Sequence, residues 1–222
     1  MDLRIRHTLF VVLLAFLLLV PKAALAGDDG DWEFWSDNSV VWGVSENWEA
    51  KITAELKFQD DMSDYYYHHI DGGLSRKLTE WFKLGFNYRY IESDSSSGWN
   101  YENRVHVNGQ FYWQWGDYSF FDRNRLEYRD REANENTWRY RNKLTMRPPL
   151  KWTKFEIQPY VAGEVLYSTN VSSWDQYRLM AGLGSRPTDL FRISLYYMFI
   201  SKENSDDWID TNVLVLDMNL VF

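Results

Sequence analysis

The sequence predicts an all-β protein that folds as a transmembrane antiparallel β-barrel of about 10–12 strands, with twelve preferred because single-chain bacterial barrels have even strand numbers. Three observations predict this fold. Most of the chain after Gly27 alternates apolar and polar residues with a period of two, as strands with one apolar face do. Aromatic residues make up 18% of the chain, a content that suits the interfacial girdles of membrane barrels. The chain also ends on an alternating segment closed by Phe222, which resembles the last strand of bacterial outer-membrane barrels.

The first 26 residues are predicted to be a cleaved secretory signal peptide. Arg4 and Arg6 form a basic start, residues 9–20 are apolar, and Ala24-Leu25-Ala26 provides a small-residue cleavage site. The alternative is a membrane anchor, but this apolar run is too short to span roughly 30 Å of hydrocarbon as a helix. The mature chain, residues 27–222, is therefore expected to be a single barrel domain.

Ten strands are predicted from Trp48 onward, each from its two-residue alternation. They cover residues 48–59, 67–78, 81–91, 101–115, 118–129, 138–147, 155–167, 177–183, 191–200 and 208–222. Residues 32–44 also alternate, and a turn at Asp37-Asn38 would split them into a hairpin and give twelve strands; otherwise this segment lies elsewhere and the count is ten. Pro159 falls inside a predicted strand, where its missing N–H group predicts a bulge.

The connections are predicted to differ at the two ends of the barrel. Short turns are expected near residues 45–47, 79–80, 116–117, 150–151 and 187–189, and longer acidic loops near 60–65, 93–98, 130–136, 169–173 and 202–207. Short periplasmic turns and longer extracellular loops are typical of outer-membrane barrels. Tryptophans lie near both ends of the strands, as membrane interfaces favour. The alternative is a soluble β-sandwich or lipocalin-like barrel, in which the apolar face would point inward.

The final strand carries the predicted insertion signal. Leu216, Met218, Leu220 and Phe222 share one parity, and Asp217 falls on the other. We expect the apolar four to face lipid and to be read by the barrel-insertion machinery, and Asp217 to neutralise part of a basic lumen.

Several motifs together resemble the DUF2490 family of uncharacterised outer-membrane proteins. They are residues 123–129 (RNRLEYR), Trp138-Arg139-Tyr140-Arg141 running into Pro148, residues 163–167 (GEVLY) and residues 174–184 (WDQYRLMAGLG). Tyr177 departs from this resemblance, since the family pattern suggests Asn there. The resemblance covers essentially the whole mature chain and implies a barrel in the outer membrane, but it implies no catalytic residue because the family carries no established activity.

The polar parity of the strands predicts a basic lumen inside an acidic protein, whose formal net charge is −8. The predicted lumen-facing charge cluster comprises Arg89, Glu102, Arg104, Arg123, Arg125, Glu127, Arg129, Arg139, Arg141, Lys143, Glu164, Arg178 and Asp217. One interpretation is a ladder of ion pairs that fills a narrow barrel, with Glu127 and Glu164 bridging neighbouring arginines, because unpaired arginines are costly in a closed lumen. The other is a small water-filled path whose arginines favour anions.

Other chemistry is weakly indicated. The chain has no cysteine, and we expect no catalytic, cofactor-binding or metal site. His69, Asp71 and Ser75 share one face, but roughly 3.3 Å of rise per residue spreads them over about 20 Å of strand, so they form a poor catalytic triad. Asp122, Asn124 and Asn142 fall on the outward parity, which indicates a register error or bulge rather than a polar patch for a partner subunit.

The sequence therefore predicts an integral outer-membrane protein of a Gram-negative bacterium. The first functional hypothesis is a narrow porin-like channel that prefers a small anionic solute. The second is a plugged structural or interaction barrel that acts through its extracellular loops, and a lipid-modifying enzyme is a remote third. Expected partners are outer-membrane lipid, lipopolysaccharide and the barrel-insertion machinery, whereas no motif indicates a nucleic acid.

Overall fold

A computed structural model describes residues 30–95, 98–204 and 207–222. The predicted signal peptide, residues 1–26, lies outside the described residues, as does Asp206 of the predicted acidic loops. No helix in the described part of the chain is long and apolar enough to cross a membrane.

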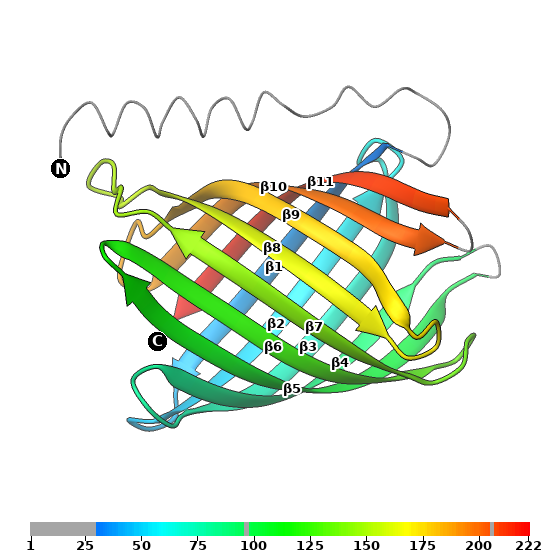
Figure 1. Ribbon diagram of the computed structural model, residues 1–222, viewed down its shortest axis with the longest axis horizontal. Coiled ribbons are helices and arrows are strands. Elements are labelled where there is room, and N and C mark those ends of the chain that lie inside the picture. The colour runs from blue at the N-terminus through cyan, green and yellow to red at the C-terminus, as the bar shows by residue number, and fades with distance from the viewer. Residues whose placement is uncertain (1–29, 96–97, 205–206) are drawn as a thin grey trace.

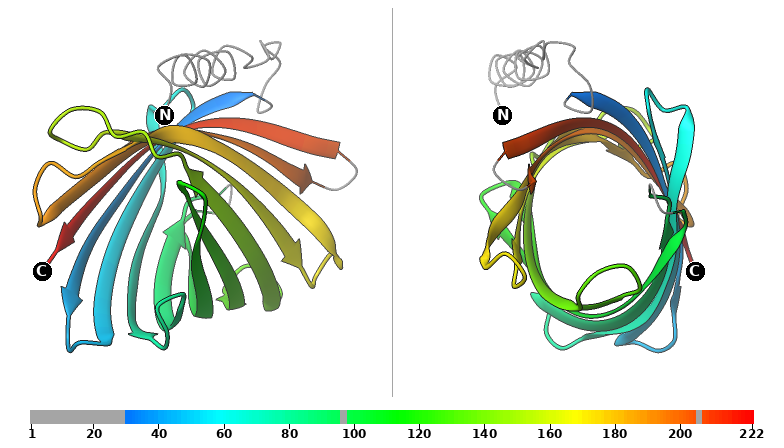
Figure 2. Two further views of the ribbon diagram at one scale, coloured as in Figure 1. Left: turned by 60° about the vertical axis from the view of Figure 1, so that its left-hand side comes forward. Right: turned by 90° about the vertical axis from the view of Figure 1, so that its right-hand side faces the viewer.

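The described residues form eleven strands that close into one barrel, drawn in Figure 1 and seen end-on as a closed ring in Figure 2. The strands are β1 (Asp31–Gly43), β2 (Trp48–Gln59), β3 (Asp64–Lys77), β4 (Phe82–Ser93), β5 (Asn100–Trp115), β6 (Tyr118–Arg131), β7 (Thr137–Arg147), β8 (Gln158–Ser168), β9 (Ser173–Ser185), β10 (Phe191–Asn204) and β11 (Asp207–Val221). Each strand pairs antiparallel with the next, and β1 closes the barrel by pairing parallel with β11.

The odd strand number corrects the preference for twelve strands and for a wholly antiparallel sheet. Asp37 and Asn38 do not form a turn, because β1 runs through them and is bonded on both sides. Asp37 lies opposite Glu55 of β2 and opposite Asp217 of β11. The Asn38 amide donates to the Ser36 hydroxyl at 3.0 Å instead of initiating a turn. An unbroken β1 makes the count odd, so the first and last strands must run in the same direction.

The apolar face of the sheet points outward and the polar face points inward. On β3, the exposed fraction is 58% for Ile70 and 4% for Asp71, its neighbour in sequence. Lys57 of β2 and Arg178 of β9 both lie over the ring of Trp35 on β1, at 3.2 and 5.6 Å from its centroid. Since β1 and β9 are not adjacent, these side chains meet inside the barrel. This arrangement is the reverse of the soluble barrel considered as an alternative.

The connections correct the predicted difference between the two ends. One end carries residues 44–47, 78–81, 116–117, 148–157 and 186–190, and the other carries 60–63, 94–95, 98–99, 132–136 and 169–172. Over these connections neither end has consistently longer loops, because the hairpin ladders continue into the polar segments. The longest, 148–157, lies at the end predicted to have short turns; the second end does carry the predicted acidic residues Asp60, Asp61, Asp94, Glu132 and Glu135.

Pro159 does not cause a bulge. β8 begins one residue earlier, at Gln158, and pairing with β7 extends only to Val161, so the proline interrupts no ladder on that side. It lies opposite Leu183 of β9 in regular register, and the register shift in this pair falls between Leu166 and Tyr167. The predicted bulge at Pro159 is therefore wrong.

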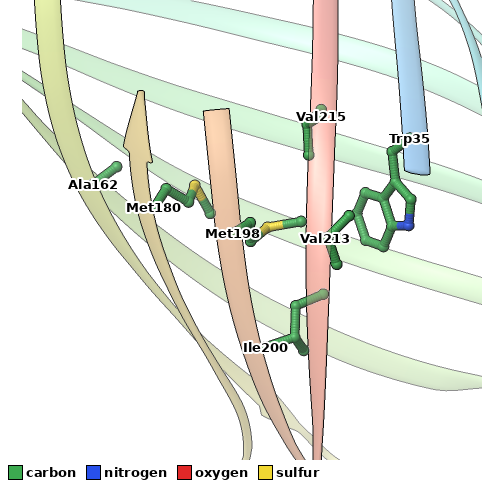
Figure 3. Packing of buried hydrophobic residues seen from close by; sticks show 7 residues of the cluster. All are labelled: Trp35, Ala162, Met180, Met198, Ile200, Val213 and Val215. Carbon is green, nitrogen blue, oxygen red and sulfur yellow. The ribbon is translucent and has the colours of Figure 1, made fainter. Parts of the chain in front are cut away.

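One part of the interior is apolar. Figure 3 shows the side chains of this apolar cluster gathered along β8–β11 and β1: Trp35, Ala162, Met180, Met198, Ile200, Val213 and Val215. They follow one another in the ladder, since Ala162 lies opposite Met180, Met180 opposite Met198, and Met198 opposite Val213. The charged residues of the candidate site lie mainly on β5–β8, and Arg178 of β9 borders the apolar cluster at Trp35.

Candidate functional site

Glu127 of β6 is the centre of the interior charge cluster, and its side chain is fully buried. Arg139 binds one carboxylate oxygen through Nη2 at 2.7 Å, and Arg104 approaches the same oxygen at 3.6 Å. Arg125 and Arg141 contact the other oxygen at 3.4 and 3.3 Å. These arginines come from β5, β6 and β7 and share the inward parity, so strand register alone brings them to one carboxylate.

Glu164 of β8 is a second centre. Arg123 and Arg141 each place Nη2 at 2.9 Å from its Oε1, and Arg178 of β9 approaches Oε2 at 3.3 Å. Arg141 thus bridges Glu164 to Glu127. This confirms the expectation that the two glutamates bridge neighbouring arginines.

Glu102 of β5 extends the cluster towards the end that carries residues 132–136. It binds Arg104 at 2.6 Å and Arg129 at 2.7 Å, and Arg104 links it to Glu127. The connected set, called here the arginine network, consists of Arg104, Arg123, Arg125, Arg129, Arg139, Arg141, Arg178, Glu102, Glu127 and Glu164. Each carboxylate accepts charge-assisted bonds, which are stronger than neutral ones.

A second polar group adjoins the network through an amide. Asp71 of β3 binds Arg89 Nε at 2.8 Å and His106 Nε2 at 2.8 Å, and it accepts a bond from Asn87 Nδ2 at 2.7 Å. Asn108 connects this group to the network: its amide donates to Asn87 Oδ1 at 3.0 Å, and its Oδ1 accepts a 2.6 Å bond from Arg125 Nε. Arg89 therefore belongs to this neighbouring group and is not bound directly to the arginine network.

Two residues of the predicted cluster lie apart from it. Lys143 faces inward opposite Glu164, but among the described residues it forms no ion pair, and its Nζ lies 5.9 Å from the centroid of the Tyr196 ring. Asp217 lies opposite Asp37 and Ser194, and its carboxylate accepts a bond from Asn219. It contacts no arginine of the network, so any neutralisation of the lumen by Asp217 is through space and not by an ion pair with these arginines.

The predicted C-terminal residues Leu216, Met218, Leu220 and Phe222 lie on the outer face of β11 and just beyond its end. Met218 lies opposite Ile193 of β10, and Leu220 opposite Phe191. Phe222 is bonded to β1 through both backbone groups, since its N–H donates to Val41 at 2.9 Å and its carbonyl accepts from Gly43 at 3.1 Å. The chain end is thus part of the barrel seam.

The residues considered for catalysis are occupied by structural contacts. His69 contacts Glu55 at 3.1 Å, and Asp71 is held by Arg89, Asn87 and His106. Ser75 lies opposite Glu49 and Gly85, away from both. No group of three potential metal ligands is placed to hold an ion in the part of the chain that the structure describes.

The outward polar residues form a real cluster, and the expected register error is wrong. Pairing across β5, β6 and β7 is regular at these positions. Asp122 accepts bonds from Asn124 and Asn142, both at 2.7 Å, and Asn124 accepts a 2.5 Å bond from the Tyr140 hydroxyl. These side chains satisfy one another on the outer surface, which explains how polar residues are tolerated there.

The contact between Asp71 and His106 was missed by the sequence analysis. These residues lie on β3 and β5, so the contact crosses the intervening strand β4. Beside them, the inward Gly73 of β3 leaves room for Asn87 of β4, which a Cβ there would meet and which donates to Asp71. Inward glycines flanking inward polar residues are the signal that would have suggested this contact.

The comparison with known families fits this geometry. Residues 32–211 match the family described as a protein of unknown function, DUF2490. The chain belongs to the DUF2490 family. The match covers β2 to β10, nearly all of β1 and the start of β11, and it includes every residue of the arginine network. No curated protein sequence and no solved structure matches the chain.

Proposed function

We propose that this DUF2490 protein is an integral barrel of the bacterial outer membrane whose lumen is closed, and that it acts through its outer surface and its acidic loops. The observation that carries the closed lumen is the burial of the network: the exposed side-chain fraction is 0% for Glu127 and 1% for Glu164. Side chains that line a water-filled path would be accessible to solvent.

The outward apolar face supports the membrane location. Large apolar side chains on the outer face, such as Ile70 and Phe86, are each 58% exposed, while charged residues are inside. In water this arrangement would expose the apolar surface, whereas a closed barrel in lipid satisfies its backbone and buries that surface. The acidic loops at one end suit divalent cations and lipopolysaccharide.

Side-chain size supports the closure. Barrels of about eight strands are filled by side chains, whereas 16–18 strands leave an aqueous channel. An eleven-stranded barrel lies between these cases, so long arginines can fill one part while the apolar cluster fills the rest. We propose no catalytic role, because His69, Asp71 and the carboxylates of the network are each engaged by neighbouring side chains.

A second candidate function is a gated channel that prefers anions. The observation that favours it is the excess of arginine over glutamate in the network, because an arginine-rich wall lowers the barrier for negative solutes. In this case the network would have to rearrange before solute could pass.

Planar-bilayer recordings of the purified, folded protein separate the two candidates. A closed barrel gives no conductance step above that of lipid alone, with an established porin as the positive control. Steps with anion selectivity would contradict closure and support the gated channel. Cation selectivity that persists after Arg123, Arg125, Arg139 and Arg141 are changed to Gln would exclude both.

Membrane location has its own test. Cell membranes are separated by density, and the outer-membrane fraction is extracted with alkaline carbonate. The proposal expects the protein to stay with that fraction after extraction, and recovery in the soluble periplasmic fraction would contradict it.

A further inference from the structure

The arginine network is not electrically balanced by its own residues. It contains seven arginines and three glutamates, which leaves a formal excess of four positive charges. Arginine cannot relieve this excess by losing a proton, and buried uncompensated charge is costly. Each guanidinium offers about five N–H donors and each carboxylate about four acceptor sites, so donors also outnumber acceptors. Water can supply acceptors, but only an anion supplies acceptors and negative charge.

The geometry locates the least satisfied part of the network at Arg123. Its Nη2 binds Glu164, but its Nε is buried without a hydrogen-bond partner among the described residues. Its side chain is 21% exposed, the largest fraction among the seven arginines. Arg123 is therefore the most exposed arginine of the network, while its Nε, which has no partner among the described residues, is covered by neighbouring atoms.

A second cation lies beside Arg123. Lys143 is directly opposite it on β7, and directly opposed like charges are destabilising. Lys143 forms no ion pair within the described ranges, because the carboxylate opposite it, Glu164, is already held by three arginines. On the other side of Arg123, Gln110 of β5 provides a polar neighbour.

We propose that Arg123 and Lys143 bind a small inorganic oxyanion of the phosphate class inside the barrel. The exposed part of the Arg123 guanidinium and the Lys143 ammonium would donate to its oxygens, and its charge would offset part of the network's excess. Guanidinium and ammonium groups are the side chains that proteins use for such oxyanions. A lipid phosphate is not the proposed source, since this position is enclosed by the barrel wall.

The site goes beyond the proposed function and does not depend on it. It rests on the interior contacts, whereas the proposed function concerns closure and location. Conductance could reveal an open barrel while phosphate binding persists, or phosphate binding could fail in a barrel that is closed, so the two failures are distinguishable.

Titration calorimetry with inorganic phosphate tests the site on the folded, detergent-solubilised protein. Thermal unfolding in phosphate is compared with unfolding in chloride at equal ionic strength. We expect saturable phosphate binding and a higher Tm in phosphate. Lys143→Gln should weaken binding about tenfold or more, since losing one charged partner typically costs more than 1.4 kcal/mol, and Lys143→Arg should restore it.

Lys83→Gln is the matched control. It also removes one inward cation, but Lys83 is already paired with Glu49 at 3.2 Å, so phosphate binding should persist. Arg123→Gln is the second test, and if it fails to fold, Lys143→Gln decides because Lys143 has no ion pair with the described residues to lose. Equal weakening in Lys83→Gln and Lys143→Gln, or no difference between phosphate and chloride, would overturn the site.

Discussion

The inward side chains from β3 to β8 are largely polar or charged and are held by ion pairs, whereas the apolar cluster on β8–β11 and β1 is held by packing, beside charged neighbours such as Arg178 and Asp217. The change from ion pairing to apolar packing begins within β8. Glu164 binds three arginines, while Ala162, two residues earlier on the same face, packs in the apolar cluster. The side chains of both halves fill the same barrel, so differences between the halves reflect side-chain chemistry and not the geometry of the sheet.

Substitutions in the two halves should affect the stability of the barrel in different ways. In the apolar half each side chain contributes through contact area, and methionine can adapt to small gaps. In the ionic half each carboxylate neutralises several arginines at once, so one loss leaves several charges without a partner. The stability of the ionic half therefore depends on every ion pair being present, whereas that of the apolar half depends on how well its side chains fill the available volume.

Removing the central carboxylate should have the largest effect. Glu127→Leu keeps a side chain of similar size but leaves Arg104, Arg125, Arg139 and Arg141 without this partner. Breaking a buried ion pair from one side costs about 3–5 kcal/mol, so we expect a loss of at least this size. The measurement is urea unfolding of the refolded barrel, followed by tryptophan fluorescence.

Glu80→Leu is the control for that prediction. Glu80 also pairs with a cation, Lys77, but both groups are exposed, and such pairs contribute little. A Glu127→Leu barrel that unfolds at the same urea concentration as Glu80→Leu would show that the network is not a cooperative unit.

Creating a cavity in the apolar half should have the next largest effect. Met198 is almost fully buried and lies between Met180 and Val213 in the ladder. Met198→Ala should destabilise the barrel by about 2–4 kcal/mol in the same assay, as buried Met→Ala changes do. Met218→Ala is the matched control, because Met218 lies on the outer face where detergent or lipid can fill the space; an equal loss in both variants would contradict a packed interior.

Comparison of the two halves explains what the sequence could predict. Strict alternation located ten strands and the inward charges, because a period of two follows directly from strand geometry. The pairing of Glu127 and Glu164 with arginines was predictable because burying so many like charges demands counter-charges. The apolar half was less visible, since Val213 and Val215 make residues 213–216 apolar on both parities and hide the alternation.

The strand number and the cross-strand partners depend on how the barrel closes, which the sequence pattern of a single segment does not reveal. A hairpin at Asp37-Asn38 satisfies local turn propensity, yet β1 gains ladder bonds on both sides by remaining straight. Asp217 is inward as expected, but closure places it opposite Asp37 and away from the network. The outward Asp122 cluster was mistaken for a register error because its hydrogen bonds join two strands and are visible only in the sheet.

The smallest predicted effect concerns a glycine that lets rings pack at the edge of the apolar half. Gly182 lies opposite Tyr160 and Tyr196, whose ring centroids are 5.9 Å apart. A Cβ on Gly182 would clash with Tyr196 and lie 2.6 Å from the Leu195 carbonyl oxygen. Because backbone atoms must move to admit it, Gly182→Ala should cost about 1–3 kcal/mol, as overpacking does.

Gly163→Ala on the neighbouring strand β8 is the control for that glycine. Gly163 has nothing within 4 Å of the added Cβ and lies opposite Leu144 and Leu179. Alanine should therefore be neutral or stabilise by up to about 1 kcal/mol, because it restricts the unfolded chain. Both variants are measured by urea unfolding. If Gly182→Ala matched Gly163→Ala, the rings would have room to move, and the apolar half would be loosely filled compared with the ionic half.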